Sequence, residues 1–148
     1  MKLSTGLENA VLVTGSLKAS LNLCFLKVYS GTVPADADAA LGGATLLHCF
    51  SAGAGGTGGT GGTFDATPVN GAIVKTASET WTGSSVASGT ASFARLVLGS
   101  DDGTSSTTQV RMQLTVGTVG TDLLFGNTTF TSSGTRSLSG FTITLPKA

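Results

Sequence analysis

The side chains best suited to acid–base or nucleophilic chemistry are few, and His48 is the single histidine. It lies beside Cys49 in the stretch 46–50, where the residue pattern predicts a strand. A nucleophilic triad needs a histidine next to a Ser or Cys and an orienting carboxylate. Neighbouring strand residues point to opposite faces of a sheet. We therefore expect His48 and Cys49 to diverge, with His48 partly buried on a face shared with Leu46 and Phe50, and we predict no enzyme activity.

The cysteines give little support for a metal or cofactor site. Cys24 and Cys49 each lie among apolar residues, and the sequence begins without the apolar segment of a secretory signal. This context favours two reduced, buried thiols over a disulfide, although pairing between them stays open. Two cysteines and one histidine fall short of the four ligands of a structural zinc site. We predict neither metal nor cofactor.

Two other motifs have a structural interpretation. Asp101 and Asp102 precede Gly103, a sequence typical of hairpin turns, whereas the carboxylates of a hydrolytic pair face each other across a cleft. The glycine-rich stretch 51–63 lacks the lysine and the following helix of a phosphate-binding loop. We predict a surface loop or an extended arm over 51–63.

Some residues are candidates for contact with a partner. Trp81 lies among polar residues, where a tryptophan either anchors a sugar or protein contact or fills the core of a small β domain. Two arginines lie within strand patterns, which is compatible with salt bridges between subunits and with a solvated face. The candidate partner contacts are Leu7, Val11, Tyr29, Trp81, Arg95 and Arg111.

Charge and composition narrow the choice of partners. Charged residues make up 11% of the chain and their net charge is zero. The basic residues are scattered, so we expect no nucleic-acid partner. No apolar run approaches the roughly 20 residues that a membrane span needs, so we expect no membrane partner. A neutral, hydroxyl-rich exterior fits a protein docked to partners or to copies of itself, and a soluble β domain of unusual composition is the alternative.

The residue patterns predict one β domain over 1–148 with a helical segment at 1–21. Apolar residues recur there at helical spacing, Ser4 or Thr5 can cap the helix, and Gly15 can end it, with a further turn at 16–21. This helix would pack over one end of a sheet or reach a neighbouring subunit. Strands are predicted at 24–30, 44–50, 71–76, 90–98, 108–116, 123–125, 128–131 and 137–145. Short strands at this spacing favour an all-β fold, either a β-sandwich or a jelly-roll-like barrel.

Several stretches resemble a known family. They are 3–9, 15–18, 25–38, 81–83, 89–95 and 141–146, which together extend over nearly the whole chain. The sequence is similar there to small structural proteins of tailed bacteriophages and prophages. The resemblance implies a virion component made in the host cytoplasm.

Within the virion, our first expectation is a head decoration (cement) protein on the capsid surface. Its partners would be the phage major capsid protein and copies of itself. The alternative is a tail, collar or fibre-associated module, in which Trp81 or Tyr29 would bind sugar. A virion-borne hydrolase ranks third, because no triad is present.

Overall fold

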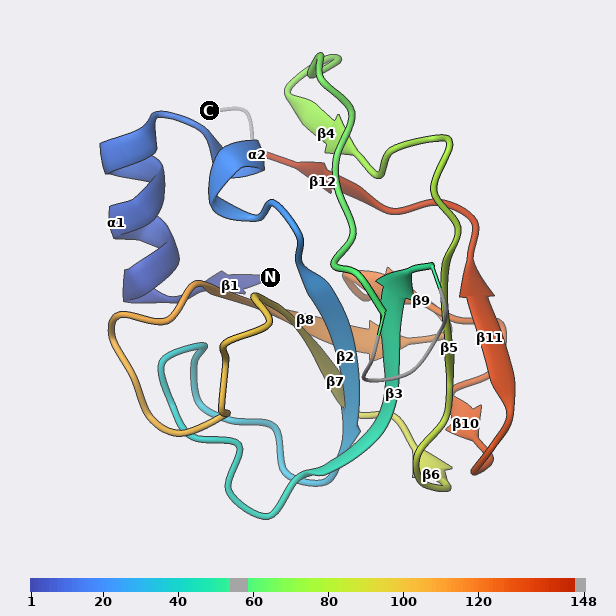
Figure 1. Ribbon diagram of the computed structural model, residues 1–148. Helices are drawn as coiled ribbons and strands as arrows, with labels where there is room; N and C mark the ends of the chain where they lie inside the picture. Colours follow the sequence, from blue (N-terminus) through green and yellow to red (C-terminus); the bar gives the residue numbers. More distant parts are fainter. Residues whose placement is uncertain (54–58, 146–148) are drawn as a thin grey trace.

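Strands dominate the computed structural model, which describes residues 1–53 and 59–145 (Figure 1). In chain order the elements are β1 (Lys2–Leu3), α1 (Thr5–Thr14), α2 (Leu17–Ser20), β2 (Phe25–Ser30), β3 (Thr45–Ala52), β4 (Ala72–Val74), β5 (Trp81–Ser84), β6 (Gly89–Thr90), β7 (Phe93–Val97), β8 (Arg111–Gly117), β9 (Leu123–Leu124), β10 (Thr129–Phe130), β11 (Thr135–Leu138) and β12 (Thr142–Thr144). The predicted all-β fold with a short N-terminal helix is confirmed, and the arrangement is consistent with a β-sandwich.

A large, mainly antiparallel sheet forms the frame of the molecule. Its strand order is β1-β8-β7-β2-β3-β5-β11, and β9 adds to β8 in parallel. Two-stranded ribbons of β6 with β10 and of β4 with β12 complete the set. Figure 1 shows the β4–β12 ribbon at the same end of the molecule as α2.

The register of β2, β7 and β8 separates an apolar face from a polar one. Leu26 pairs with Leu96, which pairs with Met112, and all three are buried in the core. One residue along, Lys27 pairs with Arg95, which pairs with Gln113. Because side chains alternate along a strand, this second row lies on the opposite face of the sheet. The sheet therefore carries cationic and amide side chains on the face that points away from the core.

The N-terminal segment is helical over most of its predicted range. Ser4 caps α1 by accepting a hydrogen bond from the Leu7 backbone N–H, and Gly15 ends the helix with φ of 69°, where glycine is favoured. Leu7 is buried in the core, as the helical spacing predicts. The prediction is wrong for Leu3, which lies in β1 and pairs with Met112 rather than starting the helix.

No helix among the described residues has the length and apolarity to cross a membrane.

Some predicted strands are divided, and two strands, β1 and β5, were missed. The 90–98 prediction covers half of β6 and all of β7, and the 137–145 prediction covers half of β11 and all of β12. β5 escaped detection because its sequence, Trp-Thr-Gly-Ser, lacks alternating apolar residues. Gly83 has a structural role in this strand, since a Cβ there would collide with the backbone carbonyl of Cys49 on β3.

The glycine-rich stretch is only in part the loop or arm that was predicted over 51–63. Ser51 and Ala52 belong to β3, and the middle of the predicted arm, 54–58, lies outside the described residues. At its far end, Gly62 exchanges two backbone hydrogen bonds with Cys24, of 2.7 and 3.1 Å. Gly61 and Gly62 are buried, and the indole of Trp81 packs directly against Gly62. The prediction is wrong for these two glycines, which are part of the core.

Replacing Gly62 with alanine should destabilise the fold, because the new Cβ would overlap the buried Trp81 ring. Overpacking of this kind costs about 1–3 kcal/mol. Gly140→Ala is the matched control, since a Cβ at Gly140 meets no atom within 4 Å. Urea denaturation of both variants measures the difference, and equal midpoints would show that Gly62 is not packed in this way.

Candidate functional site

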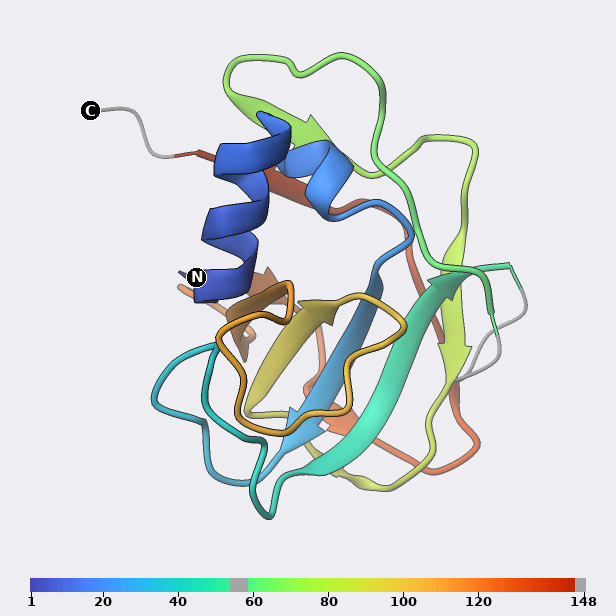
Figure 2. The ribbon, with the colours of Figure 1, turned by 60° about the vertical axis from the view of Figure 1, so that its left-hand side comes forward.

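Three of the candidate contact residues meet on the outer, polar face of the sheet. Tyr29, Arg95 and Arg111 lie on β2, β7 and β8, and all three are buried. They are covered by two connections, 31–44 and 98–110, whose backbone and side chains bind the arginines. Figure 2 shows the 98–110 connection crossing in front of β7. Both interpretations of the arginines, salt bridges between subunits and a solvated face, are therefore wrong, since their partners lie within the chain.

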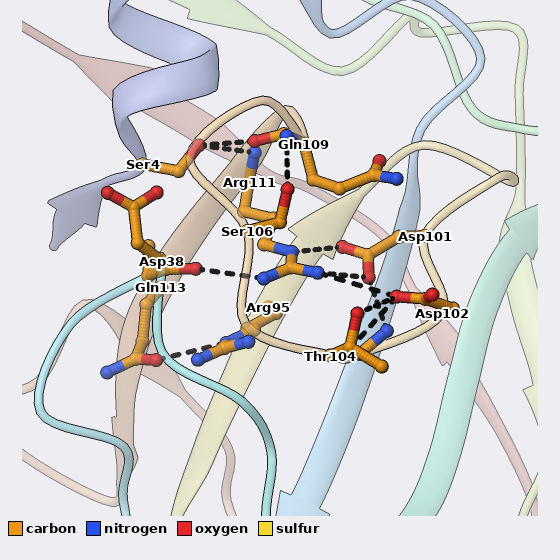
Figure 3. Close-up of polar contacts among 12 residues, drawn as sticks. Ser4, Asp38, Arg95, Asp101, Asp102, Thr104, Ser106, Gln109, Arg111 and Gln113 are labelled. Atoms are coloured by element: carbon orange, nitrogen blue, oxygen red, sulfur yellow. Dashed lines mark hydrogen bonds and ion pairs between the residues drawn. The ribbon is translucent and has the colours of Figure 1, made fainter.

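Arg111 forms a bidentate ion pair with Asp101 (Figure 3). Its Nε donates to Oδ2 at 2.6 Å and its Nη2 donates to Oδ1 at 2.9 Å. The side chains of Arg111 and Asp101 are 0% and 5% exposed. Asp101 is thus not in the tight hairpin turn that was predicted, because 98–110 is a long connection held down by this pair. Asp102, 64% exposed, lies 3.9 Å from Arg111.

The donors of Arg95 bind neutral oxygens, whereas Arg111 binds a carboxylate. Its Nε donates to the side-chain oxygen of Gln113 at 3.0 Å, and its Nη2 donates to the carbonyls of Asp36 and Ala39. Gln113 in turn donates to the Pro34 carbonyl at 2.8 Å. These bonds fasten the 31–44 connection to the sheet. Burial, and then the charge of Arg111, lowers the pKa of Arg95.

One donor of Arg95 stays without a partner. Its Nη1 is buried and forms no hydrogen bond within 1–53 and 59–145. No carboxylate in these ranges comes within salt-bridge distance of Arg95. An open cavity of about 230 Å³ adjoins this arginine, and its lining residues are Lys27, Tyr29, Leu41, Ala44, Leu46, Arg95, Val97, Asp101, Asp102 and Gly103.

His48 lies on the core face, opposite to Cys49 as predicted. Its Nδ1 is 3.0 Å from the hydroxyl of Ser85, and its ring packs against Phe50 and Phe130. Ser85 and His48 are both buried, and no carboxylate orients the imidazole, because Nε2 forms no hydrogen bond in the described chain. Burial lowers the pKa of His48 to about 4, so the ring is neutral near pH 7. This pair has the spacing of a nucleophile and a base but neither access to substrate nor the third group.

The predicted environment of His48 is right for Phe50 and wrong for Leu46. A bulge between Val28 and Tyr29 shifts the register, so that His48 pairs with Val28 whereas Leu46 pairs with Tyr29. An extra residue in one strand reverses which side chains share a face. Leu46 therefore lines the cavity on the outer face.

The remaining candidates divide between core and surface. Leu7 and Trp81 are fully buried, and the Trp81 indole donates to the Glu79 carboxylate at 2.8 Å. Trp81 thus has the core role that was one of its two interpretations, and its ring is not accessible to a sugar. Val11 is half-buried against the core on α1. Cys24 and Cys49 are both free and buried, and burial raises the pKa of each thiol.

One end of the molecule carries an apolar surface that the sequence did not single out. Leu12 and Val13, 82% and 87% exposed, lie near the C-terminal end of α1. Figures 1 and 2 show α2, β4 and β12 at this same end. We call the exposed apolar residues there the apical surface, and they are Leu12, Val13, Val69, Val74 and Leu145.

A groove of about 330 Å³ lies at the apical surface, between α2, β4 and β12. Leu17, Ile73, Ile143 and Leu145 give it mainly apolar walls, and Lys18 is its single charged lining residue. The sequence analysis overlooked Leu12 and Val13. These two apolar residues fall outside the helix face that carries Leu7 and Val11, which indicates an exposed apolar surface.

Within the part of the chain that the structure describes, no group of three or more His, Cys, Asp or Glu side chains is placed to hold a metal ion. Comparison with known protein families, with curated proteins and with solved structures gives no match to this chain.

Replacing Asp101 with asparagine should destabilise the protein strongly, because it leaves the Arg111 charge buried without its carboxylate. Breaking one partner of a buried ion pair costs about 3–5 kcal/mol. Asp102→Asn is the control and should leave the free energy of unfolding unchanged within error, since Asp102 is exposed. Chemical denaturation of both variants is the measurement. Similar losses in the two would contradict the geometry described for Asp101.

Stability should fall as the pH decreases from about 6.5 toward 4, because His48 is neutral in the fold. With a folded-state pKa of about 4 against an ordinary 6.5, only the unfolded chain binds the proton in this window. The slope approaches about 1.4 kcal/mol per pH unit. His48→Asn should flatten the dependence between pH 6.5 and 5. Parallel stability profiles for the variant and the natural chain would overturn this assignment.

Proposed function

We propose that this chain is a structural protein of a tailed-phage virion, a capsid decoration or cement protein that binds the major capsid protein. The sequence resemblance supports the virion role. The observation that carries the proposal is the apical surface, where an apolar groove and exposed apolar side chains occur together. Exposed apolar side chains gathered at one end of a protein are typical of an interaction site.

The energetics of the apical surface suit docking to an ordered lattice. Leu12 and Val13 have almost their whole side chains in water. Burying one such side chain contributes about 1.5–3 kcal/mol, before the cost of ordering the partners is subtracted. Many weak sites of this kind, repeated over a lattice, hold a shell together. Because the net charge of this chain is zero, no long-range electrostatic repulsion opposes its approach to a charged shell.

Stabilisation by this protein would need no covalent chemistry. A protein that binds the assembled shell more tightly than its separate subunits shifts the equilibrium toward assembly. Copies of the chain can also meet one another at the symmetry axes of the lattice. The absence of enzyme activity is part of the proposal, and it is supported by the burial of the single histidine, His48.

Adding the protein to particles that lack it should raise the temperature at which they release their genome, because the apical surface bridges capsid subunits. The natural chain should bind such heads in many copies, and Leu12→Ser/Val13→Ser should bind at least about tenfold more weakly, given the lost apolar burial. Both replaced side chains are exposed, so the variant should keep its fold. Co-sedimentation with heads and heat-induced genome release are the two measurements.

Val119→Ser is the matched control for this experiment. Val119 is as exposed as Leu12 but lies in the connection after β8, and its replacement should leave binding unchanged. Absence of any binding by the natural chain would overturn the decoration role, and a handful of copies per particle would point to a collar or tail position. Equal binding by the Leu12→Ser/Val13→Ser variant would overturn the assignment of the apical surface.

A further inference from the structure

The cavity on the outer face of the sheet has features of a ligand site that the proposed virion role does not use. We propose that it binds a small organic acid, with the carboxylate held between Arg95 and Lys27 and a short apolar chain against the apolar residues of the lining. This inference is independent of the proposed function, because the cavity lies on the outer face of β2 and β7 whereas the apical surface involves α1, α2, β4 and β12.

The first argument is a pair of neighbouring cations that form no salt bridge, although Asp101 and Asp102 also line the cavity. Lys27 and Arg95 are direct cross-strand partners on β2 and β7, and both line the cavity. Like charges at directly opposed positions of antiparallel strands destabilise a sheet. Neither cation has a carboxylate within salt-bridge distance in the described ranges, since Asp101 is bound by Arg111. An anion placed between Lys27 and Arg95 would relieve the repulsion.

The second argument is the unused donor of Arg95. This side chain is 1% exposed, and its Nη1 lacks a hydrogen-bond partner while Nε and Nη2 are both engaged. Leaving a charged donor buried and unpaired is costly, and a carboxylate is the group whose geometry best suits a guanidinium. Tyr29 adds a further donor, because burial raises the pKa of its phenol and keeps it protonated.

The shape of the cavity selects the rest of the ligand. Leu41, Leu46 and Val97 supply the apolar wall of the cavity. The volume of about 230 Å³ exceeds the ~150 Å³ of a protein cavity that accommodates benzene. Asp102, which is largely exposed, also lines the cavity, so the site opens to solvent. An acid of about four to six carbons fits this combination, and an inorganic anion would leave the apolar wall uncovered.

Titration of the full-length protein with butyrate, followed by amide chemical shifts, tests the proposal. We expect saturable binding, with shifts concentrated on residues of β2, β7 and 99–103. Butanol has the apolar chain without the charge, and inorganic phosphate has the charge without the chain. At constant ionic strength both should bind at least about fivefold more weakly than butyrate.

Variants of Lys27 and Tyr29, the other two donors of the site, leave the contacts of Arg95 in place. Lys27→Gln and Tyr29→Phe remove one donor each without touching the bonds that Arg95 makes to 31–44, and each should weaken butyrate binding about fivefold. Lys18→Gln, at the apical groove, is the control and should change nothing. Absence of saturable butyrate binding, tighter binding of phosphate, or equal weakening in all three variants would overturn the assignment.

Discussion

The buried arginines on the outer face of the sheet are the constraint on which much of the architecture depends. A β-sheet with one face in the core commonly leaves its other face to water. Here two long connections close over that face, and Arg95, Arg111 and Gln113 bind their carbonyls and Asp101. Burying a guanidinium is tolerable only when its donors find partners. The connections at 31–44 and 98–110 are therefore ordered by the side chains that they cover.

The same polar face ties the N-terminus to the rest of the fold. The Ser4 hydroxyl accepts from the Arg111 backbone N–H at 2.9 Å and donates to the Gln109 carbonyl at 2.7 Å, while it also caps α1 (Figure 3). One hydroxyl thus fixes the start of the helix at the point where β8 begins. From this point α1 runs toward the end of the molecule where α2, β4 and β12 lie, so that Leu12 and Val13 are exposed there. Leu12 and Val13 of the apical surface are therefore presented on a helix rather than on a loop.

Helices and strands that follow from the pattern of neighbouring residues were predicted correctly. Features that depend on contacts between distant residues were not. Alternation located β2, β3 and β8, and the spacing of Leu7 and Val11 located α1, because each pattern is a property of neighbouring residues. Gly62 was assigned to an arm because nothing local reveals that Trp81 packs against it.

The candidate site shows the same division between local and distant information. Arg95 and Arg111 were correctly recognised as strand residues. Their burial could not be predicted, since it depends on loops distant in sequence. The Leu46 error came from a bulge, which shifts a register without a clear signal in the residue pattern.

A cryo-electron microscopy map of the intact particle tests the central claim, that this chain acts by docking an apolar end onto a viral shell. The account predicts this fold at every equivalent position outside the capsid, with α1, α2, β4 and β12 against the major capsid protein. The outer-face cavity would then point away from the contact. A shell without this chain, or one that contacts it through the face that carries Arg95, would contradict the account.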